Sequence, residues 1–141
     1  MFLNHIPVLV LITCQVGFLS AETVKVHIQP VCIMDNGATK YGEDIHVSLW
    51  EEDFSSSPLW DLFDSDDFLD AKQVPSDTPI QLEGSEIEIF SLEPYLIIRH
   101  SCFGYGSLET FHLSRVTPDD NNVYNMGRFV ITRNGYIFDD N

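Results

Sequence analysis

The chain has 141 residues, of which 22 are acidic and 7 are basic, and its formal net charge is −15. This length is typical of a single domain. An acidic surface repels nucleic acid and anionic membrane surfaces, and the sequence contains no basic run that would offset the repulsion. We therefore expect no nucleic-acid partner, and no motif in the chain indicates a cofactor.

The first 21 residues differ from the rest of the chain. An apolar run over Ile6–Leu19 ends at the small residues Ser20–Ala21, and the first charged side chain is Glu22. The run is too short to span a bilayer comfortably, and its position and abrupt end are typical of a secretory signal peptide. We predict a signal peptide over 1–21 and a secreted domain over 22–141 that does not span a membrane. A buried N-terminal strand or helix is the alternative interpretation.

Beyond the signal, apolar and polar residues alternate, which is the pattern of strands with one buried face. In the first segment Val24, Val26 and Ile28 share a face. The hairpin signal Asn134–Gly135 joins the last two segments. Strands are predicted, in chain order, over 24–32, 45–50, 95–102, 108–114, 124–132 and 136–138, with shorter candidates around 68–74, 80–83 and 86–89.

The predicted strands are short, and Gly, Pro and Asp separate them. No segment shows sustained helical periodicity. This pattern predicts an all-β fold, a two-sheet antiparallel β-sandwich of about seven to eight strands.

The cysteines predict one disulfide. Cys14 is removed with the signal peptide, which leaves Cys32 and Cys102. An even number of cysteines in an oxidising compartment favours a bridge, and both residues fall on apolar faces of predicted strands. In the chain-entropy model such a bridge stabilises the fold by on the order of 4 kcal/mol.

Several segments resemble the nematode transthyretin-like family. The most specific are Pro94–Tyr95 and His100–Ser101–Cys102 on one strand, at the family's spacing from Trp50–Glu51–Glu52–Asp53. The resemblance extends over nearly the whole predicted secreted domain, and the other matching segments are 66–70, 82–86 and 123–131. It implies a secreted, transthyretin (prealbumin)-like β-sandwich. Members are generally of unknown biochemical activity, and some act as extracellular ligands or bridging proteins.

The chain departs from the family in three places. Two further cysteines that the family often carries have no counterpart around 107–109 or in the tail 139–141, which supports pairing of the two that remain. The turn at 77–80 lacks the family's Asp–Gly pair, and the stretch 55–63 is longer than usual. Function carried over from any one member is therefore not assumed.

A catalytic function is the alternative that the resemblance raises. Relatives of transthyretin include a hydrolase of 5-hydroxyisourate, which uses histidines, an arginine and a C-terminal Tyr-Arg-Gly-Ser ending. This chain instead ends Tyr136–Asn141, and no nucleophile is paired with a base in a recognisable motif. We predict that the protein is not an enzyme. The histidines on separate predicted strands are interpreted as structural, hydrogen-bonded residues; they are His27, His46, His100 and His112.

The acidic segment Asp64–Asp70 is the one candidate for a metal site. Its carboxylates are close enough in sequence to share Ca²⁺, but it lacks the glycine and the distal glutamate of an EF-hand loop. Charge runs of this kind are usually solvated loop faces. We expect no metal ion, with calcium binding as the alternative.

Large apolar residues in the same acidic region form the candidate partner-binding site. They are Leu59, Trp60, Leu62 and Phe63. Exposed together, they would anchor an interface; folded inward, they would cap one end of the core. The predicted function is an extracellular binding or bridging protein, whose partner is an unknown extracellular protein, a lipid or a small hydrophobic molecule. A secreted host-interacting protein without a defined ligand is a further alternative. The sequence leaves the oligomeric state open.

Overall fold

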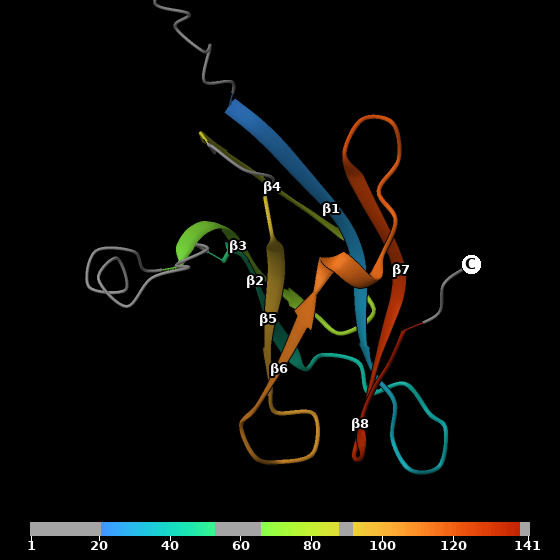
Figure 1. Cartoon of the computed structure of the whole chain (residues 1–141). Helices are drawn as coiled ribbons and strands as arrows, with labels where there is room; N and C mark the ends of the chain where they lie inside the picture. Colours follow the sequence, from blue (N-terminus) through green and yellow to red (C-terminus); the bar gives the residue numbers. More distant parts are fainter. Residues whose placement is uncertain (1–20, 53–65, 88–91, 139–141) are drawn as a thin grey trace, which may run out of the picture.

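The computed structural model describes residues 21–52, 66–87 and 92–138, which form strands and one 3₁₀ turn (Figure 1). Residues 1–20 of the predicted signal peptide lie outside this part of the chain. No helix in the described ranges is long and apolar enough to cross a membrane. The elements are β1 (Ala21–Cys32), β2 (Asp44–Glu51), β3 (Asp67–Pro75), β4 (Ile80–Ile87), β5 (Pro94–His100), β6 (Ser107–His112), η1 (Leu113–Arg115), β7 (Val123–Thr132) and β8 (Gly135–Phe138).

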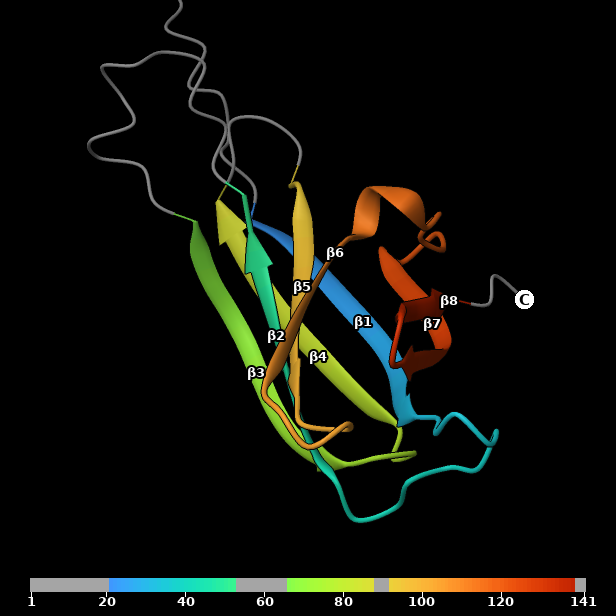
Figure 2. The same cartoon turned by 90° about the horizontal axis from the view of Figure 1, so that it is seen from below.

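The strands form two sheets of four, in the orders β4-β1-β7-β8 and β3-β2-β5-β6. Figures 1 and 2 show the two sheets facing each other across the core. The predicted all-β, two-sheet sandwich is confirmed. One pairing differs from a purely antiparallel arrangement, because β1 and β7 run parallel. Parallel neighbours need a long crossover between them, and here the whole second sheet is built between β1 and β7.

The core lies between the inner faces of the two sheets. Val24, Val26 and Ile28 of β1 are buried, as their alternation predicted. Fully burying a side chain of this size contributes about 1.5–3 kcal/mol. At the β7–β8 end the core is aromatic, since Phe129 stacks on Tyr136 with ring centroids 4.8 Å apart.

The disulfide Cys32–Cys102 is present and joins the end of β1 to the turn after β5, so it ties one sheet to the other. Both cysteines are fully buried. The strand predicted over 95–102 ends at His100, and the one predicted over 108–114 ends at His112, where η1 begins.

β4 replaces the two short strands that were predicted around 80–83 and 86–89. Gly84 and Ser85 suggest a break in the sequence, but the strand runs through them. A Cβ atom at Gly84 would lie 2.4 Å from the Cβ of Leu69. The glycine is therefore needed where β4 passes against β3 of the other sheet.

A β-bulge between β1 and β7 shapes the outer face of the first sheet. His27 pairs with Asn125 and Ile28 with Gly127, so Met126 has no partner in the ladder and turns into the core. Gly127 has φ +58°, a left-handed conformation that glycine adopts without strain.

Candidate functional site

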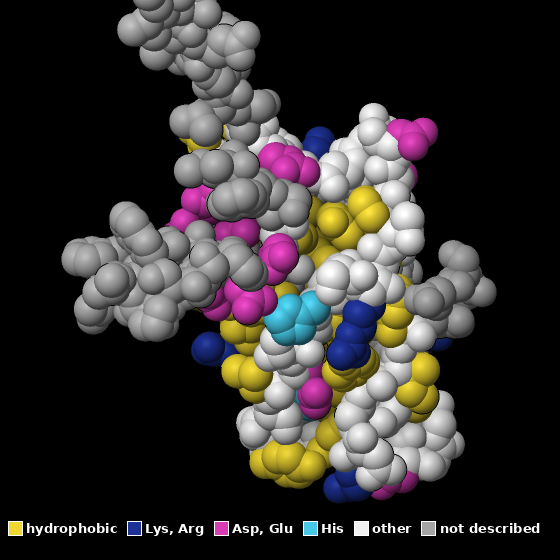
Figure 3. Space-filling view, viewed as in Figure 1, with side chains coloured by type: hydrophobic (Ala, Val, Ile, Leu, Met, Phe, Trp, Pro, Cys, Tyr) yellow, Lys and Arg dark blue, Asp and Glu magenta, His cyan; other side chains and the backbone are white. Residues whose placement is uncertain are grey.

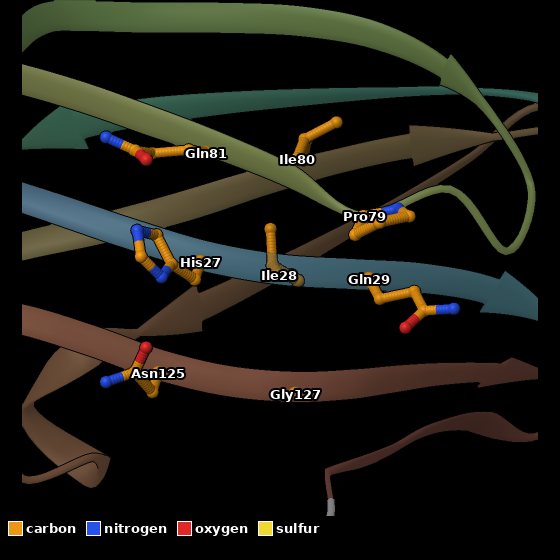
Figure 4. Close-up of a pocket in the computed structure, with 8 residues that line it drawn as sticks. All are labelled: His27, Ile28, Gln29, Pro79, Ile80, Gln81, Asn125 and Gly127. Carbon is orange, nitrogen blue, oxygen red and sulfur yellow. The ribbon is translucent and has the colours of Figure 1, made fainter.

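A groove of about 490 Å³ lies on the outer face of the β4-β1-β7-β8 sheet. Figure 4 shows that its lining residues come from the three adjacent strands β4, β1 and β7. Gly127 lines it beside the bulge, and a Cβ atom there would meet no other atom within 4 Å. The bulge and the missing side chain therefore keep this part of the groove open.

Three polar side chains form a row across the groove. His27 of β1 pairs in register with Gln81 of β4 and with Asn125 of β7, and the three lie together in Figure 4. All three are exposed. An imidazole and two carboxamides offer both donors and acceptors. Among the described residues neither the side chain of His27 nor that of Asn125 has a hydrogen-bond partner, so the polar atoms of both side chains are free for a ligand.

Charged residues flank this row on one side. Lys25 and Glu83 occupy the next positions on the same face of β1 and β4, and Lys25 Nζ lies 3.6 Å from a carboxylate oxygen of Glu83. The two opposite charges compensate each other. This end of the groove therefore presents little net charge to a ligand.

The other flank is built around Asp77, in the turn between β3 and β4. Its carboxylate accepts a hydrogen bond of 2.9 Å from the Gln29 amide and one of 3.3 Å from the Arg128 guanidinium. Its backbone N–H donates to the carbonyl of Pro30. These contacts fix the turn against β1 and β7, and they neutralise the only carboxylate of this flank among the residues that the structure describes.

The four predicted strand histidines do not come together. His27 lies on the outer face of one sheet, and His46 and His112 lie on the outer face of the other. His100 is buried inside the sandwich. Within the described ranges no group of three or more His, Cys, Asp or Glu side chains could hold a metal ion.

The interpretation of the histidines as hydrogen-bonded residues is wrong for His27, whose side chain has no partner among the described residues, and for His100. The side chain of His100 is only 2% exposed, and neither ring nitrogen has a hydrogen-bond partner in the described part of the chain. Burial lowers the pKa of the imidazole, and Glu109, 4.0 Å away, and Glu43 act in the opposite direction. Desolvation prevails, so the ring is held neutral.

His100 also borders a second groove, of about 450 Å³, together with Arg99, His46 and Leu108. The groove lies at the end of β5, next to the disulfide. The ring nitrogens of His100 and Nδ1 of His46 are shielded from solvent, so the charged group that lines this groove with accessible donors is Arg99.

Two described carboxylates of the acidic segment, those of Asp66 and Asp70, are engaged in hydrogen bonds. Asp66 accepts a bond of 2.6 Å from the hydroxyl of Tyr95, and Asp70 accepts bonds from the backbone N–H groups of Ala71 and Glu83. Asp64 lies outside the described residues. The segment therefore joins β3 to neighbouring strands, which the sequence did not indicate.

The candidate partner-binding residues Leu59, Trp60, Leu62 and Phe63 also lie outside the described residues, and their role stays a prediction. In the described ranges, single large apolar side chains are exposed instead (Figure 3). They are Tyr41, Phe68, Ile87, Tyr105, Leu108 and Ile137.

Sequence reasoning placed His27 on the polar face of its strand but did not find the groove. Its partners Gln81 and Asn125 are far apart in the chain, and only strand pairing brings them together. The one local signal was Gly127 within an otherwise regular strand, a pattern that indicates a bulge.

Comparison of the chain with protein-family models, with curated proteins and with solved structures gives no match. The function must therefore be inferred from the geometry.

Proposed function

We propose that the protein is a secreted extracellular binding protein of the transthyretin-like type. It takes its ligand in the groove on the outer face of the β4-β1-β7-β8 sheet. The observation that carries the proposal is the row His27, Gln81 and Asn125, whose polar groups face the groove on three adjacent strands.

The groove favours an uncharged, polar ligand. The Lys25–Glu83 pair and the contacts of Asp77 compensate the flanking charges, while the row between them offers donors and acceptors. A ligand with hydroxyl or amide groups at its edge, such as a sugar or a cell-surface glycan, matches these groups. This chemistry differs from the small hydrophobic molecule that the sequence suggested.

Secretion is supported by two independent features. The apolar N-terminal run has the form of a signal peptide. The Cys32–Cys102 disulfide is compatible with an oxidising compartment, because cytosolic thiols are kept reduced.

Binding is favoured over hydrolysis because of the surroundings of His27. A general base is usually oriented by a neighbouring group and acts on a nucleophile within hydrogen-bond reach. In the described part of the chain His27 has no such partner, and its neighbours in the row are carboxamides. These groups recognise a ligand but do not activate water.

The proposal is tested by ¹H–¹⁵N NMR of the ¹⁵N-labelled protein with a set of uncharged polar fragments that includes N-acetylglucosamine, uridine and allantoin. We expect fragments of this class to shift the signals of His27, Gln81 and Asn125. The substitutions His27→Ala and Asn125→Ala should weaken binding at least tenfold.

Two controls make the result specific. Benzoate, an anion, should leave these signals unchanged. Thr110→Ala, a substitution of an exposed residue on the outer face of the other sheet, should not affect binding. The proposal is refuted if no fragment of the set shifts signals of this face, or if the shifts gather on another surface.

A further inference from the structure

A third pocket, of about 330 Å³, lies where the two sheets meet at one end of the sandwich. Glu52, at the end of β2, and Glu93 and Pro94, at the start of β5, come from one sheet; Tyr124 of β7 comes from the other. His112, the last residue of β6, Ser114 of η1 and Leu92 also line the pocket. Figure 3 shows a patch of hydrophobic side chains on this face, with acidic side chains to its left and a histidine below it.

Backbone contacts hold the two acidic residues side by side. The N–H of Glu52 donates to the carbonyl of Glu93 at 3.2 Å. The N–H of Glu93 donates in turn to a carboxylate oxygen of the buried Glu51 at 3.3 Å. The backbones of Glu52 and Glu93 are therefore held next to each other at the pocket, and both side chains are exposed.

The local charge is negative. Among the residues that the structure describes, neither Lys nor Arg lines the pocket. His112 Nδ1 lies 3.7 Å from the Glu52 carboxylate, whereas Glu93 has no ion-pair partner within the described ranges. Arg115 of η1 does not line the pocket; its guanidinium lies over the Phe111 ring and donates to the hydroxyl of Tyr136. A bound cation would compensate the excess negative charge.

Tyr124 lines the pocket beside the two acidic residues. An aromatic ring attracts an ammonium group through its π face.

We propose that this pocket binds a small organic cation, an ammonium group carried on an apolar body. The ammonium lies at the carboxylates of Glu52 and Glu93, and the apolar body packs on Leu92, Pro94 and the ring of Tyr124. The volume of 330 Å³ is at the lower end of the ~300–1,000 Å³ typical of small-molecule sites. This site is separate from the groove at His27, so it does not depend on the function proposed above.

The test is isothermal titration calorimetry of the protein, expressed from the full chain, with two probes of nearly equal size. 2-Phenylethylamine carries an ammonium group, and 3-phenylpropionate carries a carboxylate on the same phenyl body. We expect the amine to bind and the carboxylate to bind at least tenfold more weakly. Equal affinities would overturn the proposal, because the apolar body alone would then account for binding.

Variants locate the site. Glu52→Gln together with Glu93→Gln should weaken amine binding at least tenfold. The control pair Asp35→Asn, Asp44→Asn changes the net charge by the same amount, at exposed positions toward the other end of β2. It should leave the affinity within twofold. Amine binding that survives the first pair unchanged, or falls equally with both pairs, would refute a specific site.

Further measurements establish that the amine binds in this pocket and not elsewhere on the protein. Thermal unfolding should show that the Glu52→Gln, Glu93→Gln protein is folded. If this protein is misfolded, the Tyr124→Ala variant replaces it in the test, and we expect this variant to bind the amine more weakly as well. His27→Ala should not change amine binding, so failure of this proposal is distinguishable from failure of the groove. The peptide N-acetyl-Gly-Lys-Gly-amide presents the same ammonium group on a chain; binding of the peptide without binding of the amine would overturn the small-molecule proposal.

Discussion

The disulfide Cys32–Cys102 ties the end of β1, in one sheet, to the turn that follows β5, in the other. The perturbation that isolates its effect is the double substitution Cys32→Ala, Cys102→Ala. Alanine is chosen because both positions are fully buried, where a serine hydroxyl would be left without a partner. The backbone N–H of Cys32 still donates to Ser76 Oγ at 2.9 Å, so the native contacts around the bridge remain.

The expected loss follows from the length of chain that the bridge closes. The two cysteines are 70 positions apart. A closed loop of that length restricts the unfolded chain by about 4 kcal/mol at 25 °C in the chain-entropy model. Since domains of this size are stable by about 5–15 kcal/mol in total, the double variant should be close to its folding limit.

The assay is urea unfolding followed by tryptophan fluorescence, with wild type and variant compared without reductant. The free energy of unfolding should fall by about 4 kcal/mol, and the m-value should rise because the unfolded chain becomes more expanded. Ser76→Ala is the matched control: it removes one hydrogen bond at the same corner, costs about 1 kcal/mol and leaves the chain connectivity intact. If the double cysteine variant loses no more stability than Ser76→Ala, the entropic reasoning is refuted.

Three other substitutions test the core. Burial lowers the pKa of His100, so the unfolded state binds more protons and stability should fall as pH drops below about 6.5; His100→Phe should remove this part of the difference between unfolding measured at pH 5 and at pH 8. Gly84→Ala would place a Cβ 2.4 Å from that of Leu69 and should cost about 1–3 kcal/mol in urea unfolding. Gly106→Ala, where a Cβ meets no atom within 4 Å, is the near-neutral control. Phe129→Ala removes a fully buried ring and should cost about 3–5 kcal/mol by the same assay.

Each of these has an outcome that contradicts it. A pH dependence that persists unchanged in the His100→Phe protein would mean that other groups cause it. Equal stabilities of the Gly84→Ala and Gly106→Ala proteins would mean that β3 and β4 separate without cost. A Phe129→Ala protein as stable as wild type would mean that the aromatic end of the core repacks completely.

The core faces of the strands could be read directly from the sequence. Val24, Val26 and Ile28 were assigned to one face by alternation and are buried, because the period of two is a property of the strand itself. The pairing of Cys32 with Cys102 was also predicted correctly, since the prediction that Cys14 is removed with a signal peptide left no other pair.

The errors arose where contacts between distant segments decide the outcome. β4 is one strand where two short strands were predicted, and residue 84 within it is a glycine because Leu69 of the other sheet leaves no space for a Cβ. His100 was expected to be hydrogen-bonded, but the packing around it supplies no partner among the described residues. The parallel pairing of β1 and β7 could not be predicted, because apolar and polar residues alternate in the same way in parallel and antiparallel strands.

The sequence by itself therefore determined the all-β class, the buried face of the main strands and the disulfide, because these depend on local periodicity and on the cysteine count. Only the tertiary structure decided which side chains meet. The row of His27, Gln81 and Asn125 exists because β4 and β7 pair on either side of β1, and the pocket of Glu52, Glu93 and Tyr124 exists because two sheets meet there. The hydrophobic pattern of a strand restricts its register, because a slip of one residue would turn the apolar face outward, but the pattern does not say which strand lies beside it.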